Sequence, residues 1–536
     1  MSTLSHSNLP LHQALRNQAR VRPDAVAVVC ENRSLTFAEL DAESDRLATG
    51  LRELGLEAGE RVGLFLPNGP EFIVSFYAAS KLGAIACPLN SSYREREIAY
   101  QLNDSGASFL ITHAKLWPVI ERTRAQLTHL RHIIVVGDAG TDSLPAVTRY
   151  EAVVSRCAAP LSVEVDPDRI VVLPYSSGTT GLPKGVMLTH RNLVAQHEQY
   201  VRATQMGPDD SYVIYMPLSH IYGIAIMGVA IRAGAKQILL ERFDLETVVR
   251  LIQEHHVTWL FAVPPVLLEL ADTPALEPAQ FRSLKFIFSA AAPLAPDIAR
   301  RVEARLGVRV IQAYGLTEAS PATHHSPLDH DRIKLESGGV LLADTEHRIV
   351  DIETGEQDLP LGEVGEIVVR GPQVMQGYWN APGETERALR NGWLYTGDIG
   401  WVDEDGYLYI VDRKKEMIKY KSFSIAPAEL EAVVLEHPDV ADCGVTGVKD
   451  TEAGEVPKAY VVPQPGRTID LNALARFVSE RVAGYKQIRH FEIIDKIPRT
   501  PSGKVLRRLL WQLETDSRVA AGAQWKLVLD GSVPPA

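Results

Sequence analysis

The stretch "PYSSGTTGLPKGVMLTH", residues 174–190, has the composition of a loop that binds oxyanions. It is not a Walker loop, which requires Gly-Lys-Ser/Thr, because Lys184 follows Pro183 and precedes Gly185. Its hydroxyl side chains can donate to a phosphate, and its glycines let backbone N–H groups turn toward one. A solvated Gly/Ser linker is the alternative. The residues predicted to face phosphate are Ser176, Ser177, Gly178, Thr179, Thr180, Gly181 and Lys184.

Strand-like and helix-like segments alternate on both sides of this loop, which indicates parallel sheets flanked by helices. Apolar runs predict strands over 25–30, 61–66, 132–136, 237–241, 259–263, 284–289 and 308–314. Helical periodicity predicts helices over 36–54 and 246–256. Ligands of such sheets bind beyond the carboxyl ends of the strands. We therefore expect the site in the loops after residues 175, 289 and 314.

Beyond about residue 335 the pattern changes to short strands separated by Gly and Asp turns, at 347–355, 365–371 and 406–412. This predicts a small β-barrel-like subdomain. The charge run "DRKKEMIKYK", residues 412–421, is either a solvated surface or a domain boundary. Because a new helix-and-strand set follows, we predict an N-terminal domain over 1–412 and an α+β C-terminal domain over 413–536.

Composition narrows the function classes. The 536 residues are 46% hydrophobic with a formal net charge of −12, so no global basic surface exists and nucleic acid is not an expected partner. Cys30, Cys87, Cys157 and Cys443 are scattered, which favours neither a zinc site nor a disulfide framework. With no targeting signal at either end, we expect a cytoplasmic protein.

One apolar segment, residues 213–231, approaches the length of a membrane span. Pro217, Ser219 and His220 interrupt it, so we predict a buried strand, a turn and a core helix, and no integral membrane segment. The turn would place His220 and Tyr222 at the wall of a cavity.

Further polar motifs follow predicted strands or lie near the end of the chain. "QAYGLTEAS", residues 312–320, offers an aromatic ring, a hydroxyl and Glu318, whose carboxylate could bind Mg²⁺. "GWLYTGDIG", residues 392–400, offers Asp398 for ribose hydroxyls, and "RTPSGKVLRR", residues 499–508, offers Lys504.

Together these motifs resemble the acyl-adenylate-forming superfamily, which includes acyl-CoA synthetases, coumarate-CoA-type ligases, peptide-synthetase adenylation domains and firefly luciferase. "SSGTTGLPKGV", "YGLTE", "GEIVVRGPQVMQGYWN", "YTGDIG" and "PSGK" appear in family order along nearly the whole chain. "PLSHIYG" and "IKYKSFSIAPAELE" are most similar to stand-alone acyl-CoA or aryl-CoA ligases.

The resemblance implies a two-step reaction. A fatty or aryl carboxylate first attacks the α-phosphate of ATP, giving acyl-AMP and pyrophosphate, and CoA then takes the acyl group as a thioester. Mg²⁺, held by Glu318, would draw charge off the phosphates. Implied nucleotide-site residues are Gln312 at the adenine amine, Tyr314 and Gly315 at the adenine, Thr317 at the phosphates, Asp398 at the ribose hydroxyls, Arg413 at the ribose or phosphate, and Lys504 as the catalytic cation.

The second step implies a rotation of the C-terminal domain about Lys415, which removes Lys504 and brings Lys419 to the thiolation site. Acceptors other than CoA stay open: a separate acyl carrier protein, an amine, or oxygen in a luciferase-like oxidase. Where the family usually has Gly and Gln, this chain has Ser422 and Ser424. A serine at 422 would narrow the passage for pantetheine.

The acyl pocket implied by the resemblance is mostly apolar, which favours a fatty or aryl acid over an amino acid. His220 is either a gate or a structural histidine, and a homodimer stays open. The expected lining residues are His220, Tyr222, Ala262, Ala290, Ala291, Gly315 and Pro321.

Overall fold

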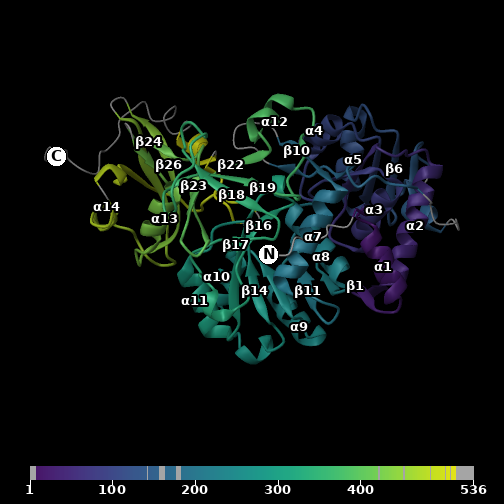
Figure 1. The fold of residues 1–536 in the computed structure, drawn as a ribbon, viewed down its shortest axis with the longest axis horizontal. Helices are drawn as coiled ribbons and strands as arrows, with labels where there is room; N and C mark the ends of the chain where they lie inside the picture. Colours follow the sequence, from purple (N-terminus) through teal and green to yellow (C-terminus); the bar gives the residue numbers. More distant parts are fainter. Residues whose placement is uncertain are drawn as a thin grey trace.

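The computed structural model describes residues 8–141, 143–155, 163–176, 183–420, 423–450, 453–482, 484–500, 503–507 and 509–514. A large N-terminal part contains two mainly parallel sheets and a smaller antiparallel one (Figure 1). A smaller part, with α13, β24, β26 and α14, lies beside the antiparallel sheet (Figure 1). The predicted α/β class, with a smaller C-terminal domain, is confirmed.

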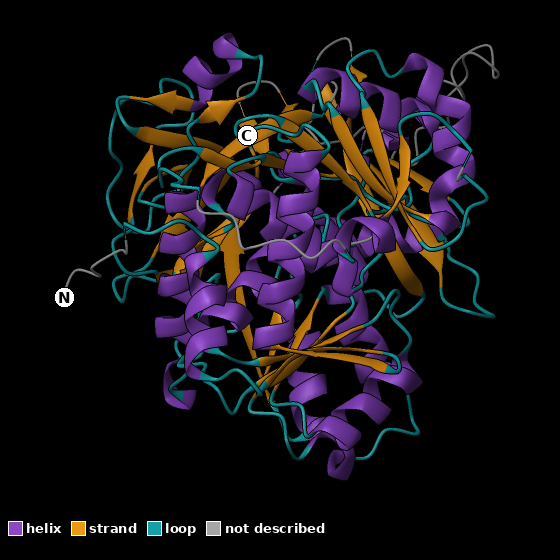
Figure 2. Ribbon diagram, turned by 90° about the vertical axis from the view of Figure 1, so that its right-hand side faces the viewer, coloured by secondary structure: helices purple, strands orange, loops and turns teal. Residues whose placement is uncertain are grey.

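The first sheet has parallel central strands, and helices cover both of its faces (Figure 2). Its order is β17 (Val340–Leu341), β16 (Ala322–His325), β15 (Arg309–Gly315), β14 (Phe286–Ser289), β13 (Trp259–Ala262), β11 (Ser211–Ile214), β12 (Lys236–Leu239), β1 (Val26–Cys30) and β2 (Arg33–Thr36). Its crossover helices are α8 (Ile221–Ala233), α9 (Leu245–His255), α10 (Pro264–Asp272) and α11 (Pro296–Leu306).

The second sheet carries the phosphate-loop motif at one end. Its order is β20 (Gly377–Tyr378), β10 (Lys184–Thr189), β8 (Ile170–Val172), β4 (Ile85–Pro88), β3 (Arg61–Phe65), β5 (Phe109–His113), β6 (His132–Val136) and β7 (Val147–Arg149), with β9 (Tyr175–Ser176) paired to β10. Its helices are α3 (Pro70–Leu82), α4 (Glu95–Ser105), α5 (Trp117–Thr123) and α6 (Tyr150–Val154).

A layer of helices lies between these two sheets, and one continuous buried core joins them (Figures 1 and 2). It includes α1 (Gln13–Val21), α2 (Phe37–Glu53) and α7 (His190–Thr204), which packs on α8. Capping boxes start two of these helices: Thr36 and Glu39 cap α2, and Thr189 and Asn192 cap α7. Thr189 also ends β10, so the strand turns directly into a helix.

The antiparallel third sheet runs from β18 (Glu346–Val350) through β19 (Gly365–Arg370) and β22 (Trp393–Val402) to β21 (Leu389–Arg390), with β23 (Leu408–Arg413) paired to β22. Helix α12 (Pro382–Ala388) follows β20. The strands predicted at 347–355, 365–371 and 406–412 are thus β18, β19 and β23.

The C-terminal part has its own sheet and its own buried core, formed by residues between Ile418 and Phe491. The sheet runs β25 (Phe423–Ile425), β24 (Ile418–Tyr420), β27 (Gly454–Pro463) and β26 (Val440–Asp450), with β28 (His490–Ile493) paired to β27. Helices α13 (Pro427–Leu435) and α14 (Leu471–Ser479) cover it. The chain passes from one core to the other between β23 and β24.

The segment 213–231 forms β11, a turn and α8, as predicted. Within the described residues, no helix is both long enough and apolar enough to cross a membrane.

Candidate active site

Three parallel strands, β13, β14 and β15, end side by side and bring two of the predicted loops, those after residues 289 and 314, to one edge of the first sheet. In register, Ala262 of β13 lies opposite Ser289 of β14, which lies opposite Gln312 of β15. Gly315, at the end of β15, is exposed. A Cβ there would lie 2.1 Å from the carbonyl oxygen of Pro321, so only glycine fits this close return of the chain.

Tyr314 and Asp398, which are buried, and the half-buried Arg413 form a polar group beside this edge. The Tyr314 hydroxyl donates to Asp398 at 2.7 Å, and Arg413 Nε lies 2.9 Å from Asp398 Oδ1. The Asp398 carboxylate raises the pKa of Arg413 above its ordinary value. Gln312 donates its side-chain amide to the carbonyl of Leu335, which fixes the orientation of that amide.

Lys504 comes from near the far end of the chain and is half-buried. Burial and the charge of Arg413 lower the pKa of Lys504, while Glu416 and Asp398 oppose that shift. Gly503, with φ +88°, makes the turn before it, and a Cβ at Gly503 would lie 2.7 Å from the ring of Pro265 at the start of α10. The C-terminal part therefore presents Lys504 to the large part in this structure.

Glu318 lies next to the entrance of the phosphate loop. Its Oε1 accepts from the Ser176 hydroxyl at 3.2 Å and from the Tyr378 hydroxyl at 2.8 Å. Among the described residues no cluster of three His, Cys, Asp or Glu side chains could hold a metal. One carboxylate among hydroxyl oxygens fits Mg²⁺, which is usually held by one or two carboxylates and by substrate phosphates.

Lys184 leaves the phosphate loop at the start of β10. Its Nζ lies 2.7 Å from Glu384 of α12 and 4.6 Å from the centroid of the Tyr378 ring. Tyr378 thus touches Glu318 with its hydroxyl and Lys184 with its ring face. The remaining predicted loop residues, Ser177, Gly178, Thr179, Thr180 and Gly181, lie outside the described residues.

His220 and Tyr222 begin α8. His220 caps the helix, since its Nδ1 accepts from the Tyr222 N–H at 3.1 Å. The side chain of His220 is exposed, and desolvation by the surrounding protein lowers its pKa. The Tyr222 ring is buried, with centroids 6.4 Å from Phe261 and 6.3 Å from Phe288.

Buried polar atoms line the same layer. Within the described part of the chain, the Tyr222 hydroxyl, Ser289 Oγ and His325 Nε2 find no hydrogen-bond partner. Burial lowers the pKa of His325 to about 4. Such atoms ordinarily bind a protein group, a water or a ligand, so this region is suited to a partly polar ligand.

The other predicted acyl-site residues surround the strand ends. Ala262 is buried, Ala290 is half-buried, and Ala291 is exposed with a φ of +74°, which is rare for a residue other than glycine. Thr317 and Pro321 are half-buried and lie on either side of the turn that ends β15.

Lys415 and Lys419 are both exposed. Lys415 is exposed in the turn between β23 and β24. Lys419, on β24, pairs with Glu353 at 3.0 Å, and both side chains are largely exposed. Residues 421 and 422 lie outside the described residues, as do the side chains of residues 423 and 424.

Sequence reasoning missed Tyr378, Glu384, Ser289 and His325. The motif "GEIVVRGPQVMQGYWN" contained Tyr378, but nothing in the sequence indicated that it faces Glu318 and Lys184.

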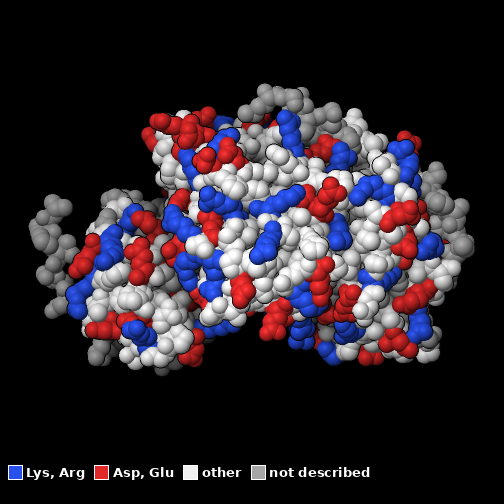
Figure 3. Space-filling model, turned by 90° about the horizontal axis from the view of Figure 1, so that it is seen from below, with Lys and Arg blue, Asp and Glu red and all other residues white. Residues whose placement is uncertain are grey.

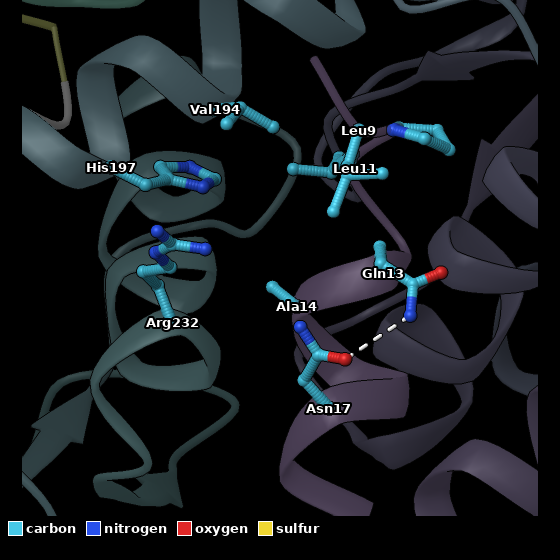
Figure 4. Close-up of a pocket in the computed structure, with 9 residues that line it drawn as sticks. Leu9, Leu11, Gln13, Ala14, Asn17, Val194, His197 and Arg232 are labelled. Atoms are coloured by element: carbon cyan, nitrogen blue, oxygen red, sulfur yellow. Dashed lines mark hydrogen bonds between the residues drawn. The ribbon is translucent and has the colours of Figure 1, made fainter. Parts of the chain in front are cut away.

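A separate recess lies where the N-terminal segment crosses α7 and α8 (Figure 4). His197 on α7 packs on Gly228 of α8, where a Cβ would lie 1.9 Å from the imidazole. Burial lowers the pKa of His197 to about 3, which suits a packing role for a neutral ring. The recess is lined by Leu9, Pro10, Leu11, Gln13, Ala14, Asn17, Val194, His197 and Arg232.

On the face drawn in Figure 3, acidic and basic side chains are interspersed.

Comparison with known proteins identifies the class. The AMP-binding enzyme family matches residues 15–379, and the AMP-binding enzyme C-terminal domain matches residues 429–504. The chain therefore belongs to the AMP-binding enzyme family.

Its relatives include CoA ligases. 4-Coumarate–CoA ligase 1 of Solanum tuberosum is 39% identical over 506 residues, covering 92% of this chain and 90% of that protein. O-succinylbenzoate coenzyme A synthetase (MenE) from Bacillus subtilis, in complex with ATP and magnesium ion, has a TM-score of 0.82 at 31% identity, over 94% of this chain and 99% of that one. ATP-bound MatB from Rhodopseudomonas palustris has a TM-score of 0.87 at 28% identity, over 95% of this chain and 99% of that one. This chain is an AMP-forming acid–thiol ligase that uses ATP, Mg²⁺ and CoA.

Proposed function

We propose that this enzyme adenylates an aryl carboxylate and transfers the aryl-acyl group to CoA. One observation carries the nucleotide half of the proposal: Gly503, next to Lys504, packs closely against Pro265 of the large domain, so the small domain presents Lys504 toward the large one. We place the domain boundary in the turn at 414–417, between the two cores.

In the first step, a carboxylate oxygen of the acid attacks the α-phosphorus of ATP, and the bond from that phosphorus to the bridging oxygen of pyrophosphate breaks. Both reactants are anions, so a cation between them stabilises the transition state more than the ground state. Lys504 supplies that cation. Asp398 and Arg413 hold the ribose, Tyr314 and Gln312 hold the adenine, and Thr317 and Lys184 hold the phosphates.

Mg²⁺ would be held by Glu318, with the Ser176 and Tyr378 hydroxyls next to it, and would neutralise phosphate charge when bound. Ser176 and Tyr378 already orient the Glu318 carboxylate in this structure. The protein thus contributes a pre-oriented carboxylate ligand, Glu318, next to the phosphate loop.

In the second step, the CoA thiolate attacks the acyl carbon and AMP leaves with its phosphate oxygen. Lys419 is paired with Glu353 on the surface, so it cannot contact an acyl-adenylate at the strand ends in this arrangement. A rotation about Lys415 would exchange Lys504 for Lys419. The arrangement described here suits the first step.

We take the acid to be aryl. Behind the strand ends the buried rings of Tyr222, Phe261 and Phe288 pack into an aromatic layer. Flat rings pack favourably against such a layer. Curated relatives that act on 4-coumarate support this class.

The free thiols of Cys30, Cys87 and Cys443 support a reducing, cytoplasmic location.

The test measures pyrophosphate release from ATP and Mg²⁺ over a panel of aryl and fatty acids, with and without CoA. Multiple turnovers that require CoA and yield an aryl thioester are expected. A single burst that CoA does not change would point instead to a carrier protein or another acceptor, and a preference for fatty acids would contradict the aryl class. Sedimentation of the same preparation tests for a homodimer.

A further inference from the structure

The phosphate-loop lysine contacts Tyr378, near the end of the motif at 365–380, and Glu384, just beyond that motif. Strand β20 pairs with β10 beside the loop, with Tyr378 opposite Val186, and α12 follows directly. We call Tyr378 and Glu384 the Lys184 clamp, because the ring of one and the carboxylate of the other contact the Lys184 ammonium.

The backbone on either side of Lys184 is fixed independently. The Trp379 N–H donates to the carbonyl of Gly185 at 2.8 Å, and the Tyr100 hydroxyl donates to the carbonyl of Pro183 at 2.8 Å. With the main chain fixed, only side-chain rotation decides where the ammonium lies. The clamp is therefore what sets its position.

Glu384 is suited to reversible contact. Its side chain is 37% exposed and that of Lys184 is 22% exposed, so water can reach the ion pair. Arg387 of the same helix also pairs with Glu384, so a displaced carboxylate keeps a cationic partner. If a phosphate oxygen displaced the Glu384 carboxylate from Lys184, Lys184 would pair with the phosphate and Glu384 with Arg387.

We propose that Glu384 is a positioning residue that occupies the Lys184 ammonium between turnovers and competes with pyrophosphate for it. This inference rests on the proposed function, in which pyrophosphate is the product of the first step. The competing carboxylate holds Lys184 ready for the next ATP and weakens the retention of the product. Pyrophosphate release thereby becomes easier at a small cost in ATP affinity.

The experiment measures binding of magnesium pyrophosphate and of magnesium ATP by calorimetry to the full chain, without acid or CoA. Glu384→Gln keeps the shape of the side chain and removes its charge. Glu386→Gln is the matched control, since Glu386 is an exposed carboxylate on the same helix. Because partly exposed ion pairs contribute little, we expect Glu384→Gln to bind pyrophosphate about two- to fivefold more tightly and Glu386→Gln to be unchanged.

A double-mutant cycle separates competition at Lys184 from a general charge effect. In a Lys184→Ala background, Glu384→Gln should no longer change pyrophosphate affinity. In assays of turnover, Glu384→Gln should lower the KM for ATP and strengthen product inhibition by pyrophosphate in the same ratio. Glu384→Ala, which removes the group altogether, should change affinity in the same direction.

Unchanged or weaker pyrophosphate binding by Glu384→Gln would overturn the proposal, as would an equal gain in the Lys184→Ala background. Because the binding measurements need no acid, they are independent of the ligase assay. An enzyme inactive with every acid but showing the predicted cycle would contradict the proposed function and not the clamp.

Discussion

The Tyr314 hydroxyl donates a hydrogen bond to Asp398 at 2.7 Å, joining two residues 84 positions apart in a buried setting. The same carboxylate faces Arg413 at 2.9 Å. Asp398 therefore has one partner from the first sheet and one from the third, and the nucleotide group is held together across a sheet boundary.

Removing the Tyr314 hydroxyl should loosen this junction. Tyr314→Phe leaves a buried carboxylate oxygen without its donor, which costs about 1–3 kcal/mol of unfolding free energy, and the KM for ATP should rise. Urea denaturation and initial rates measure the two effects. Tyr409→Phe is the control, because Tyr409 donates to Asp403 at 3.0 Å elsewhere in the molecule. Equal effects of the two variants on KM would contradict a special role for Tyr314.

Lys504 and Lys419 should serve different half-reactions. Lys504→Ala should lose adenylation, measured as acid-dependent exchange of pyrophosphate into ATP, yet still convert a supplied acyl-AMP to the thioester. Lys419→Ala should do the opposite. Lys496→Ala, at an exposed lysine of the same domain, should affect neither. Loss of the same half-reaction in both variants would rule out the domain rotation.

The adenylation rate should fall at alkaline pH earlier than an ordinary lysine would allow. The pKa of Lys504 is lowered by burial and by Arg413, and the reaction needs its charged form, so activity is lost as pH rises through that lowered pKa. In Lys504→Arg the guanidinium stays protonated up to about pH 12, so the loss of rate at alkaline pH should disappear even if the rate itself is lower. An unchanged limb would assign the titration to another group.

Tyr222→Phe should not destabilise the protein. The Tyr222 hydroxyl is buried and has no partner among the described residues, so its removal relieves an unsatisfied group. The melting temperature should stay the same or rise. Acids with a ring hydroxyl should lose kcat/KM relative to their unsubstituted analogues. A clear drop in melting temperature would show that the hydroxyl is satisfied within the protein.

Local patterns were enough to predict much of this structure. Strand, turn and helix over 213–231 followed from the residues that interrupt the apolar run, and the helix predicted over 36–54 is α2. That the loops after β14 and β15 lie side by side followed from the rule that ligands bind beyond the carboxyl ends of parallel strands. The family resemblance, confirmed by the comparisons, rested on motifs that each lie within a few residues.

Contacts between distant segments could not be predicted in this way. Lys184 and Glu384 are 200 residues apart, and Ser176 and Glu318 are 142 apart. No periodicity in one segment indicates the other. Lys184 and Glu384 meet because β20, which precedes α12, joins the sheet of β10. The surface pairing of Lys419 with Glu353 likewise depends on how the two domains meet.

The separate cores of the two domains have a consequence for damaged or partly unfolded enzyme. The groups expected to recognise adenosine lie in the large domain, whereas Lys504 belongs to the small one. Local unfolding of the small domain would leave a protein that still binds ATP but cannot carry out adenylation. Such a molecule would hold ATP without turning it over. A binding assay would not detect this loss of activity, whereas an assay of adenylation would.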